Sequence, residues 1–271
     1  PRLAAMEPTD EALRAMVPAL CTSVLLLMLT AQVDAARRVL VRLESLSASG
    51  GPMSHAPVAL ARSWIAAWRE GDAEAALCHA RRARSQAEAA HDAHQARFAR
   101  IFIGTAEWEL GMLGVAEEEL RAAGAVSGDD LPAAFASLFL AALLIEKGAL
   151  AEAEALADKR LTRSRSGGAG HGAMREAEAR WLLGEIALRR GDLHVAEREL
   201  TAAVQDLGRA PLLWLPAACR LAEMRRATGE IAAAAELMRA VDIVRIEIGG
   251  PGIRVLELRS SSAPIGDEQP L

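Results

Sequence analysis

The chain has 271 residues, of which 25% are charged and 52% hydrophobic, so a wholly disordered chain is excluded. Its 31 Lys and Arg against 36 Asp and Glu give a net charge of −5, which excludes a general electrostatic attraction to nucleic acid. Three distant cysteines argue against a disulfide-stapled secreted domain and favour a cytoplasmic location.

Alanine is the most prominent residue type of the chain. There are 59 alanines and no tyrosine, and all but two of the basic residues are arginines, which is typical of a GC-rich bacterial genome. The sequence begins at Pro1 rather than at methionine, so we expect a piece of a longer protein. Residues 1–9 are interpreted as an N-terminal linker.

The most apolar stretch lies near the start, at Val17–Thr30. It is shorter than the roughly 20 residues that a membrane span needs, and the acidic residues Glu7, Asp10 and Glu11 lead into it, unlike the start of a signal peptide. We interpret it as the first helix of a repeat and expect it to pack on a preceding domain. No membrane partner is expected.

Apolar residues then recur at helical spacing, interrupted by similar short breaks. Five breaks carry a glycine, 37 to 43 residues apart, at Gly71, Gly111, Gly148, Gly191 and Gly229. A weaker break lies at Ala31–Asp34. Such a period is typical of a helical repeat array. The breaks predict six helix pairs, near 11–30 and 34–47, 57–70 and 72–90, 93–110 and 112–125, 132–147 and 149–162, 173–190 and 192–207, and 212–228 and 230–247.

Small residues occupy fixed positions around these breaks. Five residues after each break stand Ala36, Ala76, Ala116, Ala153, Ala196 and Ala234. Seven residues before the last four stand Gly104, Ala141, Gly184 and Ala222. Two antiparallel helices approach closely only where small side chains face each other, so these positions should mark the contact. Ala87 lies outside this register and is expected to tolerate leucine.

Two segments lack the helical periodicity of the repeats, one between repeats and one after the last repeat. Thr162–Gly172 is rich in Ser, Arg and Gly and is expected to be a mobile loop. After residue 248 the periodicity stops. Residues 249–271 are predicted to be a C-terminal extension, with a short strand or capping segment at Ile253–Leu258 and a disordered tail.

The segment Trp181–Leu200 carries a family resemblance. Leu183-Gly184, Gly191, Ala196 and Leu200, with Ala203, hold the offsets of a tetratricopeptide repeat, and the chain resembles that family over residues 10–248. The resemblance implies an all-α, right-handed α-solenoid of about six antiparallel helix pairs. The longer period looks like the repeat arms of multidomain bacterial regulators, either maltose-regulator-type transcription activators or serine/threonine kinase–ATPase–repeat proteins.

In arms of this kind the first helices line a groove that binds partners. By register, the groove-facing candidates are aromatic residues with charged neighbours: Trp68, Trp108, Phe98, Phe135, Trp181, Glu185, Arg189 and Arg226. Tryptophan and arginine are enriched among interface anchors. The alternative is that the rings only fill space between alanine-rich helices.

No catalytic motif or phosphate loop is found, so we expect neither an enzyme nor a cofactor. His91 and His94 have a spacing that a metal pair could use, but no third ligand lies near, and solvated residues are the simpler interpretation. The three cysteines are expected to be buried. The arginine groups Arg81-Arg82-Arg84 and Arg160-Arg163-Arg165 are interpreted as solvated faces, and contact with an anionic partner is the alternative.

The expected function is therefore a protein–protein interaction or regulatory scaffold module, whose partner is a protein, a peptide or a neighbouring domain. The alternative is an effector-sensing arm that binds a small molecule between Trp68, Trp108 and Trp181.

Overall fold

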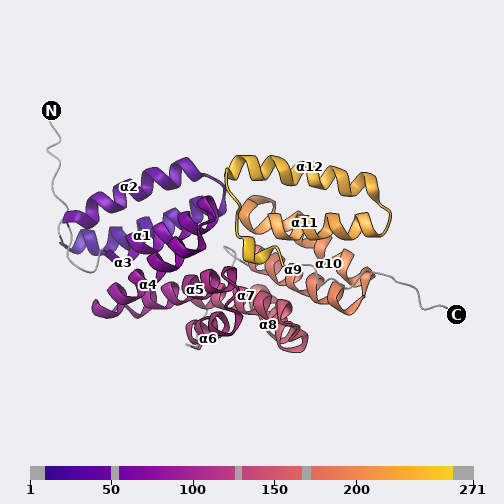
Figure 1. Cartoon of the computed structure of the whole chain (residues 1–271), viewed down its shortest axis with the longest axis horizontal. Coiled ribbons are helices and arrows are strands. Elements are labelled where there is room, and N and C mark those ends of the chain that lie inside the picture. Colours follow the sequence, from indigo (N-terminus) through magenta and orange to yellow (C-terminus); the bar gives the residue numbers. More distant parts are fainter. Residues whose placement is uncertain (1–9, 50–54, 126–129, 167–171, 259–271) are drawn as a thin grey trace. The chain divides into compact units, whose positions relative to one another are not determined.

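The computed structural model describes residues 10–49, 55–125, 130–166 and 172–258, and within these ranges the secondary structure is helical, without strands. The all-α prediction is therefore confirmed. The chain divides into two compact units, residues 1–123 and 124–271, each made of antiparallel helix pairs (Figure 1).

The first unit contains three helix pairs. They are α1 (Asp10–Leu29) with α2 (Val33–Ser49), α3 (His55–Ile65) with α4 (Ala73–Ala89), and α5 (Ala93–Glu109) with α6 (Leu113–Gly124). The helix α3 continues as a π-helical turn, η2 (Ala66–Glu70). Within this unit α4 packs against both α3 and α5, so adjacent pairs share one core.

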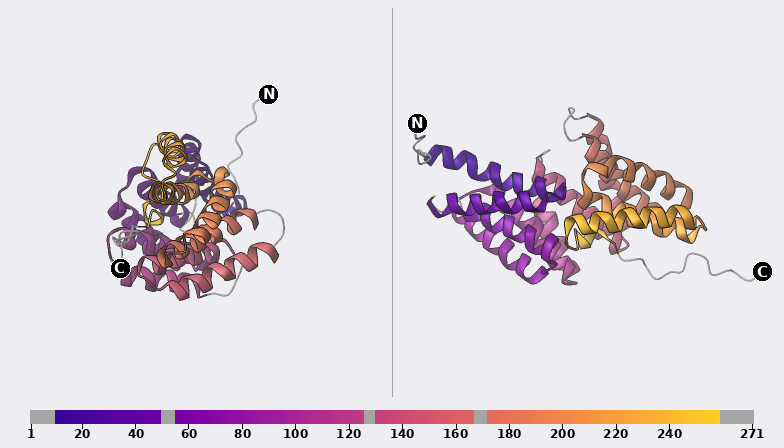
Figure 2. Two further views of the ribbon diagram at one scale, coloured as in Figure 1. Left: turned by 90° about the vertical axis from the view of Figure 1, so that its right-hand side faces the viewer. Right: turned by 90° about the horizontal axis from the view of Figure 1, so that it is seen from above.

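The second unit repeats the arrangement. Its pairs are α7 (Leu131–Glu146) with α8 (Leu150–Ser166), α9 (Gly172–Arg190) with α10 (Leu193–Asp206), and α11 (Pro211–Ala227) with α12 (Ile231–Ile248). Short 3-10 turns lie at η3 (Leu207–Arg209) and η4 (Arg254–Leu256). In the further views of Figure 2, α11 and α12 run side by side.

The predicted break residues end the first helix of each pair. All five break glycines have positive φ, between 69° and 89°, and Ala31 takes the same left-handed conformation at φ 58°. At the α5–α6 turn the Gly111 amide donates to the Trp108 carbonyl, and the Met112 amide to the Glu107 carbonyl at 2.8 Å. This pattern satisfies the last carbonyls of α5, which is why glycine is favoured there.

Aspartates cap the following helices at two of these turns. The Asp72 carboxylate accepts from the Ala75 amide at 2.8 Å, and Asp192 accepts from Val195 at 3.1 Å. Each cap satisfies a backbone donor that has no partner inside its helix.

The small residues lie where the paired helices come closest. All six predicted alanines are buried, with at most 5% of their surface exposed. A Cβ added to Gly184 would lie 2.7 Å from Cγ of Leu200, and one added to Gly104 would lie 2.9 Å from Cγ of Leu120. Leucine from the second helix therefore fills the space that the missing side chain leaves.

Three expectations about individual segments need correction. The helix α8 continues to Ser166, so Thr162–Ser166 are helical rather than part of a loop. The rest of the expected loop, up to residue 171, lies outside the described residues. Ile253–Leu258 contains a 3-10 turn, not a strand, and its apolar side chains are buried like those of a capping segment. Ala87 is fully buried, so it is not a tolerant position.

The apolar helix α1 turns its hydrophobic side inward. Val24, Leu25 and Met28 are at most 1% exposed, although Leu26 remains 44% exposed. No described helix combines the length and hydropathy that a membrane span requires.

Replacing Gly184 by alanine should destabilise the second unit by about 1–3 kcal/mol, because the new methyl group forces Leu200 to move within a packed contact. The matched control is Gly114→Ala in α6, where the added methyl meets nothing within 4 Å. Alanine is the better helix former, so the control should be neutral or stabilise by up to about 1 kcal/mol. Urea unfolding midpoints measure both, and equal midpoints would contradict the proposed close contact.

The alanine register gives a second test within one helix. Ala153→Leu places extra carbon atoms in a fully buried site of α8 and should cost about 1–3 kcal/mol. Ala155→Leu, at an exposed site of the same helix, should change stability by less than about 0.5 kcal/mol. Thermal unfolding of the two variants compares them directly, and a harmless Ala153→Leu would refute the inward register.

Candidate functional site

The five aromatic candidates are core residues rather than exposed anchors. Their side chains, those of Trp68, Phe98, Trp108, Phe135 and Trp181, are between 2% and 6% exposed. In the first unit Trp68 and Phe98 both pack on Phe102, with ring centroids 5.8 and 6.4 Å away. The space-filling interpretation therefore describes these rings, because a side chain this deeply buried offers no surface to a partner.

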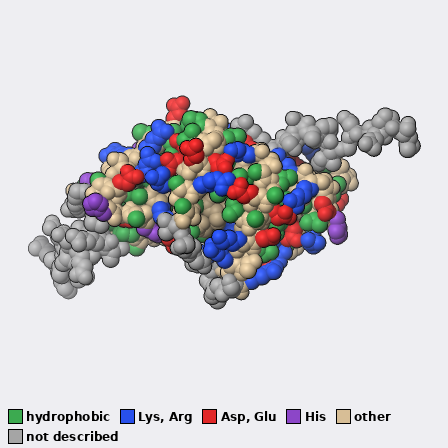
Figure 3. All heavy atoms as spheres, turned by 90° about the horizontal axis from the view of Figure 1, so that it is seen from below, with side chains coloured by type: hydrophobic (Ala, Val, Ile, Leu, Met, Phe, Trp, Pro, Cys, Tyr) green, Lys and Arg blue, Asp and Glu red, His purple; other side chains and the backbone are tan. Residues whose placement is uncertain are grey.

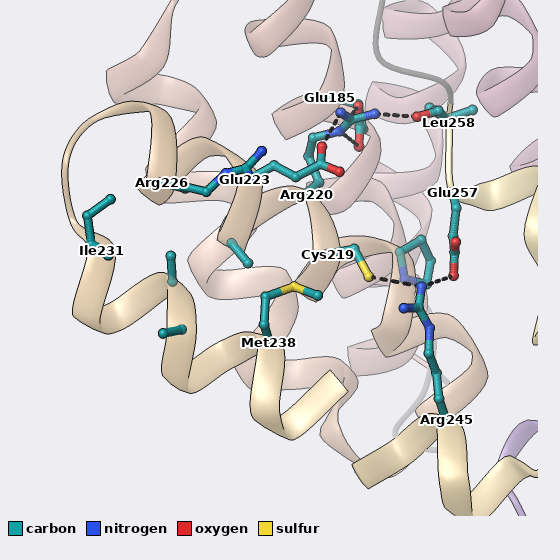
Figure 4. Close-up of a pocket in the computed structure, with 14 residues that line it drawn as sticks. Glu185, Cys219, Arg220, Glu223, Arg226, Ile231, Met238, Arg245, Glu257 and Leu258 are labelled. Atoms are coloured by element: carbon teal, nitrogen blue, oxygen red, sulfur yellow. Dashed lines mark hydrogen bonds and ion pairs between the residues drawn. The ribbon is translucent and has the colours of Figure 1, made fainter. Parts of the chain in front are cut away.

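The charged candidates behave differently, because two of them meet at one cavity. Glu185 of α9 and Arg226 of α11 line a hollow of about 510 Å³ in the second unit. Arg189 lies outside the lining, yet it is near enough to oppose the effect of burial on the pKa of Glu185. Figure 4 shows side chains from α9, α11, α12 and the C-terminal segment around this hollow.

One part of the cavity wall is apolar and the other is charged. The apolar part comes from α11 and α12, with Pro216, Ala222, Ile231, Ala234, Ala235 and Met238. The charged part adds Arg220, Glu223, Arg245 and Glu257 to the two predicted residues. A hollow with an apolar wall and a few polar groups is the usual form of a binding site.

Arg220 organises the charged wall. Its Nε donates to both carboxylate oxygens of Glu185, at 2.9 and 3.1 Å, and its Nη1 donates to Glu223 at 2.7 Å. Its Nη2 donates to the backbone carbonyl of Leu258. Burial raises the pKa of the Glu185 carboxyl, and the positive charge of Arg220 opposes that rise. One guanidinium thus joins α9, α11 and the C-terminal segment.

A second arginine joins the same segment to α12. Nη2 of Arg245 donates to Glu257 at 3.0 Å and contacts Sγ of Cys219 at 3.7 Å. Burial, followed by the nearby Glu257 charge, raises the pKa of the Cys219 thiol to about 11. The Cys219 thiol is therefore protonated at neutral pH.

The remaining arginines only partly match the sequence interpretation. Arg81 pairs with Glu107 at 3.1 Å and Arg84 with Glu119 at 2.8 Å, on partly exposed surfaces. Arg160 is different, because it is buried and bonds Glu178 and the Ser137 hydroxyl. It is not a solvated residue, since burying a guanidinium requires a carboxylate partner. On the face shown in Figure 3, basic and acidic side chains are interspersed.

The other candidate groups carry no site. Among the described residues no three metal-ligating side chains gather. Asp92 caps α5 by accepting from the Gln95 amide at 3.0 Å, and the His94 ring packs edge-on to Phe98. Cys21 is buried as expected, but Cys78 is exposed because it lies on the outer side of α4.

Arg220, Arg245 and Glu257 were missing from the sequence-based site. Ile253–Leu258 has no helical period, so its position against α11 had no signal in the sequence. Glu185 was the one signal for Arg220 in the sequence. It directly follows the contact glycine Gly184, and a carboxylate buried there needs a cation from the first helix of the next pair.

The repeated helix pairs, left-handed turns and small contact residues define a tetratricopeptide-like helical repeat fold. No family model and no curated protein matches the sequence. Two solved structures share the fold. NprR in complex with its cognate peptide NprX aligns with a TM-score of 0.66 and 14% identity, over 87% of this chain and 70% of NprR. A Rap protein complexed with Competence and Sporulation Factor aligns with a TM-score of 0.64 and 11% identity, over 87% of this chain and 78% of the Rap protein.

Removing the Arg220 side chain should leave Glu185 as an unpaired buried charge. We expect Arg220→Ala to lower the free energy of unfolding at pH 7 by about 3–5 kcal/mol. The loss should shrink toward pH 5. With its pKa raised above the unfolded value, Glu185 takes up a proton more readily in the folded state, so lowering the pH stabilises the folded variant.

The control is Arg190→Ala, which removes an exposed pair with Glu154. Its unfolding midpoint should stay close to that of the parent chain, since exposed ion pairs contribute little. Urea titrations at the two pH values measure both variants, and a pH-independent loss for Arg220→Ala would show that Glu185 is not the cause.

Proposed function

We propose that this chain is a regulatory recognition module without enzymatic activity, and that the cavity of the second unit binds a peptide segment of its partner. The observation that carries the proposal is the cavity wall, in which an apolar surface on α12 faces arginines of α11 and carboxylates of α9 and α11. Such a wall favours an apolar anchor side chain with a neighbouring polar group.

Arg226 indicates the chemistry of that neighbouring group. Its side chain is exposed at the cavity and makes no ion pair within the described part of the chain. A guanidinium can bind a carboxylate through two parallel hydrogen bonds. We therefore propose a peptide with an apolar side chain beside a carboxylate, with Met238 and Ile231 contacting the apolar part.

The structural neighbours support a regulatory role. NprR is seen with a cognate peptide, and the Rap protein with a sporulation factor. The proposal extends this mode of action to the present chain as part of a larger cytoplasmic regulator. Either the maltose-regulator or the kinase–ATPase context proposed from sequence would use the module to sense a partner.

Filling the cavity tests the proposal. Ala235 is an exposed residue of α12 at the cavity wall, so Ala235→Trp should block the cavity without disturbing the core. Peptides selected from a displayed random library against the full chain should bind Ala235→Trp at least tenfold more weakly. They should bind Ala155→Trp, an exposed site on α8 outside the cavity, like the parent chain.

The measurement is fluorescence anisotropy of the selected peptides. Enrichment of acidic, apolar peptides whose binding Ala235→Trp abolishes would support the proposal, and selected peptides indifferent to Ala235→Trp would refute it.

A small-molecule effector is the second candidate, because a volume of about 510 Å³ falls in the range of ligand pockets. Thermal-shift screening of anionic metabolites against the full chain and Ala235→Trp separates the two. A stabilising metabolite that fails to act on Ala235→Trp, without any selected peptide, would favour this second function.

A further inference from the structure

A second hollow, of about 240 Å³, lies in the first unit between α2, α3 and α4. The side chains with ionisable groups around it are Glu44, His55, Arg62, His79 and Arg82. Two guanidinium groups and two imidazoles thus converge from α3 and α4 on a hollow to which α2 contributes a single carboxylate.

That carboxylate orients one of the arginines. Glu44 Oε1 accepts from Nε of Arg62 at 2.9 Å and lies 2.8 Å from its Nη2. The bond holds the planar group in place, and within the described part of the chain Nη1 of Arg62 makes no hydrogen bond. A guanidinium fixed in this way is ready to donate to a further acceptor.

The other arginine is not neutralised. Arg82 lies on α4, is exposed at the hollow, and forms no ion pair in the described ranges. His79 is on the same helix, three residues earlier, so the two side chains lie on one face. With both imidazoles neutral, Arg62 and Arg82 against Glu44 leave one net positive charge around the hollow.

The pKa of His79 reflects this positive environment. It is lowered by burial, then by Arg62 and Arg82, while Glu70 and Asp72 oppose the shift more weakly. His55 and Glu44 complete the ionisable groups at the hollow. His79 is therefore largely neutral at pH 7, and a bound anion would favour its protonated form.

We propose that this hollow is a binding site for an oxyanion, namely the phosphoryl group of a small phosphorylated molecule or free phosphate. A tetrahedral dianion offers acceptor oxygens in several directions, so it can bond Arg62 and Arg82 from two helices together with an imidazole. A carboxylate offers two oxygens in one plane and would satisfy one guanidinium. The volume accommodates a phosphate with a small substituent.

Sulfate titration of the full chain tests the proposal, because sulfate remains a dianion throughout the range. At constant ionic strength we expect calorimetry to show binding that tightens several-fold from pH 7.5 to pH 5.5 as His79 gains a proton. Arg82→Ala should weaken binding about tenfold at both pH values. The double variant His55→Gln/His79→Gln should keep the affinity at pH 7.5 and lose the tightening.

Arg38→Ala is the control, since Arg38 is an exposed arginine of α2 away from the hollow. It should bind sulfate like the parent chain, and circular dichroism confirms that each variant is folded. Equal weakening by Arg38→Ala and Arg82→Ala would mean unspecific surface attraction and would overturn the proposal, as would unchanged binding by Arg82→Ala. Competition by inorganic phosphate and by a sugar monophosphate then distinguishes the two sources of the phosphoryl group.

Discussion

The close approach of paired helices is the constraint on which both units depend. At Gly104 and Gly184 there is no room for a Cβ, because Leu120 and Leu200 of the second helix occupy that space. In the other pairs, the alanines at the corresponding positions of the second helices are buried. Helices this close interlock along their length, so the turn conformation and the register are fixed together.

Narrow spacing has a cost that the aromatic residues offset. Alanine buries little apolar area, so a core made mainly of alanine contributes less hydrophobic stabilisation than one of leucine. In the first unit Trp64, Trp68 and Phe102 supply the missing area, with ring centroids 5.3 and 5.8 Å apart. The repeated register of Trp68 and Trp108 therefore follows from packing, and the same register that made these two groove candidates places them in the core.

Ion pairs extend the repeat to the charged residues. Arg84 pairs with Glu119 and Arg220 with Glu185, each 35 residues apart, and Arg190 pairs with Glu154 at a separation of 36. These separations approach one repeat, so each pair joins neighbouring helix pairs. Buried pairs such as Arg220–Glu185 add little net stability, but breaking one is costly, which opposes slippage of one pair against the next.

The sequence predicted features that depend on local chemistry. Glycine is favoured at the left-handed turns, Asp72 and Asp192 cap the helices that follow two of them, and small residues are needed where helices touch. The helix boundaries expected from these signals agree with the structure within a few residues. The burial of the Trp181 side chain could not be predicted from the sequence, because it depends on how neighbouring helix pairs stack. The cavity depends on Arg220 and on the C-terminal segment, which has no helical periodicity. The repeat register therefore predicted only two of its lining residues, Glu185 and Arg226.

The two cavities differ in charge, and this difference separates their modes of recognition. In the second unit three arginines face three carboxylates, so the lining has no net charge and exerts little long-range attraction. The peptide binding that we propose there would depend on short-range pairing and apolar fit, and it should respond weakly to salt. The hollow of the first unit carries net positive charge, which increases when His79 is protonated. Attraction of an anion to that hollow should therefore weaken as ionic strength rises, because salt screens exposed charges.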